Sequence, residues 1–353
     1  MAAHHSSDVD RMRAAVFRAP GWVEVHEVAA PVPAAGEARV RVAFCGVCGS
    51  DLHRFRGDLP LVSVTPGHEI SGIVDSVGAG VTSVGPGDKV CVEPLVPCGA
   101  CRYCRTGHHQ LCAHAHYLAA DVDGGFAEYV IVPATMVHRL PDTIPLEQAA
   151  LMEPLAVAVH AARQGGVGPG SSVCVLGAGT IGLLAVQVAR AYGASQVMIT
   201  AKHAHQAAAA KSLGADSVIA ADADVPAEVV RLTDGEGVDC VMETVGGHAP
   251  TPALAMDIAR KHGNVVIVGG FASPQPVDFR QLVMKELRIL GSHTYDYGPN
   301  MQRDFEVALG LVASGRVRLG DFTKHRFPLD RIQDACQAAV SKDDNLLKAL
   351  IVC

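Results

Sequence analysis

The sequence predicts a mixed fold in which a β-rich region is followed by an α/β region with a parallel sheet. Three observations predict this. The chain has 353 residues, of which 49% are hydrophobic and 18% charged, enough for the cores of two domains. Short segments that alternate polar and apolar residues fill the chain up to about residue 150. Strand and helix patterns then alternate, which indicates a parallel sheet covered on both faces.

The charge and cysteine content exclude several classes of protein. Lys and Arg total 29 against 36 for Asp and Glu, without a basic cluster, and there is a single Trp, so no nucleic-acid partner is expected. Glycines interrupt the apolar run 173–189, which indicates a buried strand and helix rather than a membrane span. The N-terminus lacks the apolar segment of a signal peptide, so eleven cysteines indicate a reducing compartment, the cytoplasm.

The β-rich region follows a flexible polar tail at residues 1–11. Met12 begins the first strand pattern, which continues over Ala14–Phe17. Arg39–Phe44 alternates at period two, and Ile70–Val77 does so more loosely. Because glycine-rich turns separate these segments, we expect an irregular β domain with long loops.

The α/β region starts near residue 150. A strand over Val173–Leu176 leads into a helix over Thr180–Tyr192, which ends at Gly193. Further strands are predicted at Gln196–Thr200, Ser217–Ile219, Val238–Met242, Val265–Val268 and Arg288–Leu290, and further helices at Gln206–Leu213 and Pro252–Lys261. After residue 297 a helix over Phe305–Ala313, short strands and a final helix and strand form a segment too short to fold alone, which is expected to return to the first domain.

Four cysteines follow the pattern Cys98-x2-Cys101-x2-Cys104-x7-Cys112. Four thiolates this close, with glycines for sharp turns, can surround one Zn²⁺ tetrahedrally. Such a site has no open position, so it would stiffen the loop rather than react. Scattered loop thiols or the ligands of an iron–sulfur cluster are the alternatives to structural zinc. The neighbouring histidines are expected on the surface: His108, His109, His114 and His116.

Two further motifs contain metal-binding residue types. The segment 46–53 contains Cys48, and the segment 67–69 contains His68 and Glu69. A thiolate, an imidazole and a carboxylate from separate loops form a mixed zinc site with an open position. A substrate oxygen bound at that position loses its proton near neutral pH. Glu69 is either a ligand or a carboxylate that contacts a ligand.

The residues around Cys48 offer a path for the released proton. Ser50 and His53 supply a hydroxyl and an imidazole that can carry it, although His53 alone would be an ordinary loop histidine. Asp51 is a candidate acceptor that holds His68 in the required tautomer. Cys45, at the end of a period-two strand, is expected to be a packed core thiol.

A glycine motif follows the strand that ends at Leu176. Gly177, Gly179 and Gly182, with Thr180 and Ile181 between them, lie where a strand turns into a helix. In that position the first glycine makes the turn, the second lets the backbone approach a pyrophosphate, and the third permits close helix packing. The helix N-terminus adds partial positive charge. An ordinary glycine-rich turn is the alternative.

The end of the next strand predicts the choice of nucleotide. An acidic residue is expected there to bind the adenine ribose hydroxyls, but Ala201 occupies the place, followed by Lys202 and His203. Without the carboxylate a ribose 2′-phosphate is not repelled, and a nearby ammonium can attract it. We therefore predict NADP in preference to NAD. The alternative is a solvated Lys202 beside a permissive pocket.

Taken together, these motifs resemble those of the zinc-dependent medium-chain dehydrogenases, in the sorbitol and polyol branch of the alcohol dehydrogenase family. The resemblance covers about Met12 to Cys353. It rests on GVCGSDLH at 46–53, GHE at 67–69, the four cysteines, DGGFAEY at 123–129, EPL at 153–155 and the glycine motif.

The resemblance implies a GroES-like catalytic domain with an inserted Rossmann domain. The catalytic domain would comprise residues 12–153 and 297–353, and the Rossmann domain residues 154–296. Members of the family are usually homodimers or homotetramers, often joined through Rossmann edge strands. The apolar strand at Ile289–Leu290 could have this role.

The resemblance also implies site residues. The catalytic zinc would be held by Cys48, His68 and a carboxylate, Glu69 or Glu153, because Met-Glu-Pro-Leu matches the polyol and glucose dehydrogenase branch. Proton relay carries over to the serine and histidine named above. The nucleotide-binding residues are predicted to include Val245, Val268 and Gly269 as well.

We therefore expect reversible, NADP-preferring oxidation of a secondary alcohol (a polyol, sugar or cyclitol) to a ketone, with one catalytic and one structural Zn²⁺ per chain. Thr294 stands where sorbitol dehydrogenases have Arg, which argues against sorbitol itself. Asp296 either favours a substrate that bears an amine or caps a loop. The alternatives are a dehydrogenase of a simple alcohol or amino alcohol (threonine-like or an aminocyclitol), a zinc-free reductase of activated double bonds, and a non-catalytic dinucleotide-binding sensor.

Overall fold

The computed structural model describes residues 10–298 and 301–353, which form two compact units. The first unit comprises the chain up to Val96, His116–Leu151 and His325–Cys353. The second comprises Pro97–Ala115 and Met152–Lys324. Most of the expected N-terminal tail, residues 1–9, lies outside the described residues, and Arg11 already belongs to the first strand.

The first unit is built on a seven-stranded sheet in which β16, β17, β3, β4, β5 and β9 follow one another and β8 also pairs with β3. Its strands are β3 (Glu37–Gly46), β4 (Glu69–Val77), β5 (Lys89–Val92), β8 (Tyr129–Pro133), β9 (Val137–Arg139), β16 (His325–Pro328) and β17 (Ala349–Val352). Two strand pairs stand outside this sheet: β1 (Arg11–Ala19) with β2 (Trp22–Ala29), and β6 (Leu95–Val96) with β7 (His116–Tyr117). The C-terminal β17 is antiparallel to β3, with Ile351 opposite Cys45.

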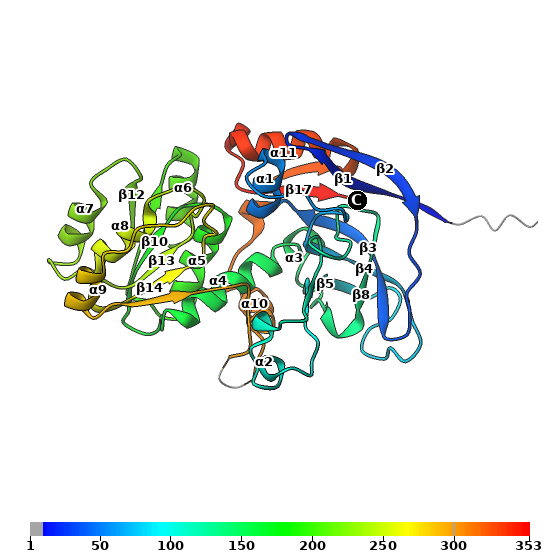
Figure 1. Cartoon of the computed structure of the whole chain (residues 1–353), viewed down its shortest axis with the longest axis horizontal. Helices are drawn as coiled ribbons and strands as arrows, with labels where there is room; N and C mark the ends of the chain where they lie inside the picture. The colour runs from blue at the N-terminus through cyan, green and yellow to red at the C-terminus, as the bar shows by residue number, and fades with distance from the viewer. Residues whose placement is uncertain (1–9, 299–300) are drawn as a thin grey trace, which may run out of the picture. The chain divides into compact units, whose positions relative to one another are not determined.

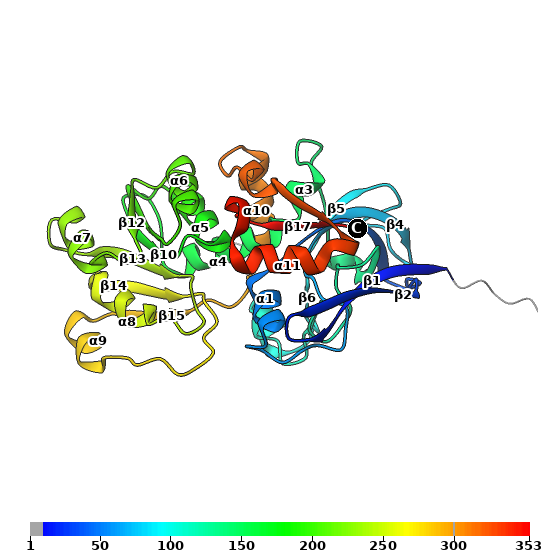
Figure 2. The ribbon, with the colours of Figure 1, turned by 90° about the horizontal axis from the view of Figure 1, so that it is seen from above.

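The core of the first unit lies under this sheet and its helices. It includes Val40, Ile70 and Phe126, all buried, and Cys45 is buried among them as expected. The helices are α1 (Gly49–Arg56), α3 (Leu146–Ala149) and α11 (Ile332–Ser341). Helix α11 packs against β17 and β2, and Figure 2 shows it beside the β1–β2 hairpin. Helix α1 was not predicted, because its eight residues are mostly polar and carry too short an apolar pattern.

The second unit contains a six-stranded parallel sheet with the order β12-β11-β10-β13-β14-β15, which confirms the predicted parallel sheet (Figure 1). Its strands are β10 (Ser172–Leu176), β11 (Gln196–Ala201), β12 (Ser217–Ala220), β13 (Val238–Glu243), β14 (Ala259–Ile267) and β15 (Arg288–Gly291). Strand β10 is apolar and buried on both faces, at Val173 and Val175 as well as at Cys174 and Leu176.

Helices cover both faces of this sheet. The helices of the second unit are α4 (Met152–Gln164), α5 (Thr180–Ala191), α6 (Ala204–Ser212), α7 (Val225–Leu232), α8 (Thr251–Ile258), α9 (Phe279–Lys285) and α10 (Asp304–Ala313), of which α10 packs on α4, and a short α2 (Arg102–Arg105) lies in the four-cysteine segment. Helices α7 and α8 share a buried cluster with Cys174 and Leu176 of β10. Helix α5 packs on β10 and β11. None of the helices among the described residues has the length and hydropathy needed to span a bilayer.

One predicted boundary is wrong. The helix expected over Pro252–Lys261 ends at Ile258, and β14 begins at Ala259, well before the expected start at Val265. The backbone at Ala259 is extended because Ala259 pairs with Val238 across the sheet. Pairing with a neighbouring strand thus overrides the helical pattern of the sequence.

Candidate functional site

Two neighbouring antiparallel strands bring the mixed metal-binding residues together. Gly46, the last residue of β3, lies opposite Glu69, the first residue of β4. The loop that follows β3 therefore begins where the loop that precedes β4 ends, and Cys48 and His68 lie in these two loops. The sulfur of Cys48, a ring nitrogen of His68 and a carboxylate oxygen of Glu69 all lie within 4.8 Å of one another.

This geometry fits a zinc ion. Zinc binds cysteine sulfur at about 2.3 Å and histidine nitrogen at about 2.0 Å, so tetrahedral ligand atoms lie about 3.5 Å apart. The donor set of Cys48, His68 and Glu69 is one that zinc accepts, and three protein ligands leave a fourth position for a substrate oxygen. His68 and Glu69 are buried and Cys48 is half-buried, so the donors are largely shielded from water.

Glu69 has an ion-pair partner that sequence analysis missed. The ammonium of Lys348 contacts its carboxylate, and both side chains are buried. Lys348 lies just before β17, which pairs with β3 and so brings the lysine to this end of the sheet. A Cβ atom at Gly46 would lie 2.0 Å from Glu69 Oε2 and 2.8 Å from Lys348 Cε. The absence of a side chain at Gly46 therefore makes room for this pair.

Asp51 orients the backbone around Cys48. Its Oδ2 accepts a hydrogen bond of 2.9 Å from the Cys48 N–H, which fixes the start of α1. Burial raises the pKa of Asp51, and the nearby charge of His68 partly offsets this. The expected role of Asp51 in setting the tautomer of His68 stays a prediction.

Helix α1 also carries the two proposed relay residues. Ser50 lies in its first turn and His53 in its middle, both half-buried. The Nδ1 atom of His53 lies 2.9 Å from Asp58 Oδ2 and 3.2 Å from Arg56 Nη2. The hydrogen bond from His53 lowers the pKa of Asp58. Asp58 thus orients the His53 ring, a function that sequence analysis missed because the turn after α1 was not foreseen.

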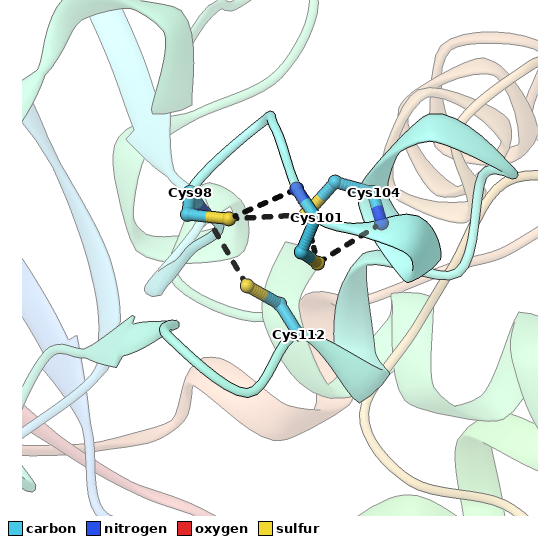
Figure 3. Close-up of side chains that lie close together, drawn as sticks. All are labelled: Cys98, Cys101, Cys104 and Cys112. Atoms are coloured by element: carbon cyan, nitrogen blue, oxygen red, sulfur yellow. Dashed lines mark hydrogen bonds between the residues drawn. The ribbon is translucent and has the colours of Figure 1, made fainter.

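The four cysteines of the second unit converge on one point (Figure 3). The sulfurs of Cys101 and Cys104 lie 3.5 Å apart and those of Cys98 and Cys104 lie 4.0 Å apart. Sulfurs around one tetrahedral zinc lie about 3.8 Å apart, so the cluster fits the ion. The N–H groups of Ala100 and Cys101 lower the pKa of Cys98 to about 6, which favours a thiolate at neutral pH.

Asp296 anchors the four-cysteine segment. Its buried carboxylate lies 2.8 Å from His108 Nδ1 and accepts a 3.0 Å hydrogen bond from Gln110 Nε2. Its own N–H donates to Asp304, which also accepts hydrogen bonds from Arg163 on α4. These contacts support the expectation that Asp296 holds a loop in place, and they do not support a role in binding an amine of the substrate. This contact also gives His108 a partner that the sequence did not indicate.

The glycine motif has the geometry of a nucleotide-binding turn. Gly177 has a φ of +99°, and its N–H donates to Thr200 Oγ1 at 2.9 Å. A Cβ atom at Gly182 would lie 1.8 Å from the Gly177 carbonyl oxygen. At Gly179, the residue before α5, no described residue other than its chain neighbours lies within 4 Å of the Cβ position, so the backbone at the helix N-terminus is open to close approach by a ligand. Thr180 and Ile181 form the first turn of α5.

The remaining predicted nucleotide residues lie at the carboxyl ends of the strands. Ala201 is buried at the end of β11, Lys202 is exposed, and His203 precedes α6. Val245 follows β13, and the pair Val268 and Gly269 follows β14; this is the edge at which parallel α/β sheets bind ligands. Glu153, the other candidate zinc ligand, is buried in the first turn of α4 in the second unit, and its role stays a prediction.

Comparison with known proteins shows similarity along the whole chain. The zinc-binding dehydrogenase family matches residues 180–314, and the alcohol dehydrogenase GroES-like domain matches residues 34–142. The chain is 36% identical to 2-dehydro-3-deoxy-L-galactonate 5-dehydrogenase of Pseudoalteromonas atlantica, over 94% of this chain and 95% of that protein. It is 35% identical to sorbitol dehydrogenase of Halalkalibacterium halodurans, over 94% and 96%. A zinc-binding dehydrogenase from Sinorhizobium meliloti 1021, solved with NADP, superposes with a TM-score of 0.88 at 32% identity, over 98% of this chain and 100% of that one.

Proposed function

The chain belongs to the zinc-type medium-chain dehydrogenases, with a GroES-like domain and a dinucleotide-binding domain, and we propose that it reversibly oxidises a secondary alcohol of a polyol, sugar or cyclitol to a ketone. The observation that carries this proposal is the cluster of Cys48, His68 and Glu69 in a chain that also has the glycine motif of a nucleotide-binding turn. The first provides a place for a Lewis acid and the second a place for a redox nucleotide.

The chain's own residues handle the proton. When bound, zinc supplies a Lewis acid for the carbinol oxygen, and the nicotinamide ring supplies the hydride acceptor. Ser50 takes the hydroxyl proton and His53 passes it to solvent from its half-exposed ring. Asp58, at 2.9 Å from His53 Nδ1, holds the ring in place.

We assign the zinc ligands as follows. One catalytic zinc binds Cys48, His68 and a carboxylate, which is Glu69 or Glu153. One structural zinc binds the four cysteines of the second unit, whose sulfur separations support it. Within the first unit, Glu69 is the carboxylate that lies within 4.8 Å of the Cys48 and His68 donor atoms, and Glu153 is the alternative.

The nucleotide is NADP in preference to NAD. Ala201 leaves the ribose-binding position without a carboxylate, and the exposed ammonium of Lys202 follows it directly. The S. meliloti relative solved with NADP supports this assignment. NAD remains a weaker alternative substrate for the same site.

The substrate is a polyhydroxylated carbon chain or ring. The two curated relatives reported above are named for a sugar acid and for sorbitol, which supports this class. An amine-bearing substrate loses its support, because the Asp296 carboxylate accepts hydrogen bonds from the four-cysteine segment.

Two further proposals concern assembly and location. We propose a homo-oligomer that associates through β15, one of the two edge strands of the parallel sheet. Three large apolar side chains on the neighbouring α9 are strongly exposed: Phe279 at 71%, Val283 at 70% and Met284 at 70%. A cytoplasmic location is supported by the eleven cysteines, none of which forms a disulfide.

An absorbance screen tests the proposed reaction. Purified protein is offered NADP or NAD with a panel of polyols, sugars, cyclitols and amino alcohols, and formation of the reduced nucleotide is followed. The proposal expects turnover on at least one polyol or sugar, faster with NADP, and none with the His68→Ala variant. Turnover confined to amino alcohols, or absent from the whole panel and from the corresponding ketones, would overturn it.

A further inference from the structure

Glu243, the last residue of β13, is a completely buried carboxylate among the loops that follow the parallel strands. Its Oε1 accepts three hydrogen bonds: from the N–H of Val245 at 2.8 Å, from the N–H of Gly246 at 3.1 Å and from the hydroxyl of Thr251 at 2.8 Å. One side-chain oxygen thus fixes the turn between β13 and α8.

The main chain of the same residue fixes the next loop. The carbonyl oxygen of Glu243 accepts hydrogen bonds from the N–H of Val268 at 2.9 Å and from the N–H of Gly269 at 3.1 Å. The following residue, Thr244, donates its hydroxyl to the carbonyl of Leu176 at 2.8 Å, where the glycine motif begins. The end of β13 therefore connects the loops after β10, β13 and β14.

The two later loops approach so closely that only glycine fits between them. A Cβ atom at Gly269 would lie 2.4 Å from the N atom of Gly246 and 2.5 Å from Oε2 of Glu243. A Cβ atom at Gly246 would lie 2.5 Å from the carbonyl oxygen of Gly270. The Glu243 carboxylate thus packs closely against Gly246 and Gly269. A shift of any of these three residues would move both loops.

The order of the strands shows which part of a nucleotide these loops face. A sheet of this kind binds a dinucleotide across the point where the strand order reverses, one mononucleotide to each half. Here the order reverses between β10 and β13, and the half formed by β10, β11 and β12 carries the adenine-side residues Ala201 and Lys202. The half formed by β13, β14 and β15 is left for the nicotinamide.

We propose that Glu243 is a positioning residue for the nicotinamide half of the nucleotide site, because it holds the loops that contain Val245, Val268 and Gly269 in one arrangement. This inference rests on the proposed function. A purely structural role does not explain the residue well, since Oε2 is buried and makes no hydrogen bond to any described residue. An apolar side chain would avoid the free energy needed to bury that oxygen.

The test compares variants of Glu243 with a control in the same strand. Glu243→Ala removes the acceptor, and Glu243→Gln retains one carbonyl oxygen for the two N–H groups. Asp239→Asn is the matched control, because Asp239 lies at the other end of β13 and accepts hydrogen bonds from Ser172 and Arg260. Binding is measured by fluorescence for NADPH and by calorimetry for adenosine 2′,5′-bisphosphate, which lacks the nicotinamide.

The inference expects Glu243→Ala to weaken NADPH binding about tenfold, since two or three buried hydrogen bonds are lost, and Glu243→Gln to weaken it by a smaller factor. Binding of the bisphosphate should stay within about twofold of wild type in both, and Asp239→Asn should bind both ligands normally. If Glu243→Ala does not fold, Glu243→Gln alone provides the comparison. Unchanged NADPH binding, or equal loss of both ligands, overturns the inference while leaving the proposed function intact. A wild type that binds no nicotinamide nucleotide overturns both.

Discussion

Each candidate ligand at the mixed metal site is held by a neighbour that has no part in the chemistry. Asp51 fixes the backbone of Cys48, the ring of Tyr117 lies edge-on to His68 at 5.7 Å, and Lys348 pairs with Glu69. Such contacts keep ligands in place and orient them for the metal. Because these neighbours hold the ligands, single substitutions at the ligands should affect the chemistry more than the fold.

Replacing either zinc ligand tests this directly. Cys48→Ser and His68→Ala should each lower kcat at least about a thousandfold, because the Lewis acid is lost, with an unchanged circular dichroism spectrum. Cys45→Ala is the matched control: Cys45 is a buried thiol close to the site and outside the ligand cluster, so turnover should persist. Activity close to wild type in either ligand variant would contradict the assignment.

Lys202 is proposed to bind the 2′-phosphate of NADP, and a single substitution tests this. Its ammonium is exposed beside Ala201, so Lys202→Ala should weaken NADPH binding about fivefold to tenfold by removing one charge-assisted contact with the 2′-phosphate. Binding of NADH should not change. The control Lys261→Ala removes an exposed lysine from β14 and should affect neither nucleotide. Equal effects of Lys202→Ala on the binding of NADPH and NADH would exclude a role for Lys202 in binding the 2′-phosphate.

Sequence analysis could predict Cys48 and His68 because each lies in a short motif of residue types that zinc prefers. It could not predict their supports. Lys348 is 279 residues from Glu69 in the sequence, and only the pairing of β17 with β3 brings them together. Asp58 was missed because the helix before it is short and polar. Contacts of this kind depend on the fold and leave no local pattern.

A buried polar cluster joins helices α10 and α4. Asp304, at the start of α10, lies 2.8 Å from His160 Nδ1 and accepts hydrogen bonds from Arg163, both on α4. Burial alone would raise the pKa of Asp304, but the hydrogen bonds from His160 and Arg163 outweigh it, so the pKa lies below its usual value. The ionised form therefore stabilises the fold.

Asp304→Asn should lower the free energy of unfolding by about 2 kcal/mol at pH 7, because the buried charge pair is broken. A group with a lowered pKa contributes its stability above its unfolded pKa, about 3.9, and loses it as the pH falls through the folded pKa. The free energy of unfolding is measured by urea denaturation. The difference in this free energy between wild type and variant should be constant down to about pH 5 and shrink below about pH 4. Asp330→Asn, in an exposed ion pair with Arg13, is the control and should change stability little. A difference that grows in acid would contradict the account.

The sequence predicted the parallel strands well, because most are short apolar runs, and the central strands β10, β11 and β13 are largely buried. The predicted element boundaries were less accurate where pairing between neighbouring strands decides the backbone conformation. Residues 259–261 continue a helical pattern, yet they form the start of β14 because Ala259 pairs with Val238. Helical periodicity extends past the true end of α8, and the sequence alone does not show which neighbour a residue will pair with.

Among the described residues, α9 presents exposed apolar side chains close to β15, an edge strand of the parallel sheet. Phe279, Val283 and Met284 lie on α9, and β15 pairs only with β14 among the described residues. An open strand edge and a nearby apolar surface favour association with a second copy of the chain. This surface is where the proposed oligomer should form.

Charge placed on this surface should weaken the association. The double variant Val283→Glu and Met284→Glu should sediment as a smaller species than wild type at micromolar concentration, because two carboxylates would be buried without partners. Val230→Glu is the control, since Val230 is also exposed but lies on α7, which contacts β12 at the opposite edge of the sheet from β15. Identical sedimentation of the double variant and wild type would exclude β15 and α9 as the interface.

We propose that a zinc ion held by Cys48 and His68 is required for alcohol oxidation. Its most direct test is turnover measured against zinc content in one preparation of the protein. We expect about two zinc ions per chain, loss of activity when chelation removes the catalytic ion, and recovery in proportion to the zinc restored. Turnover that persists at the full rate after the zinc bound by Cys48 and His68 has been removed would contradict the account.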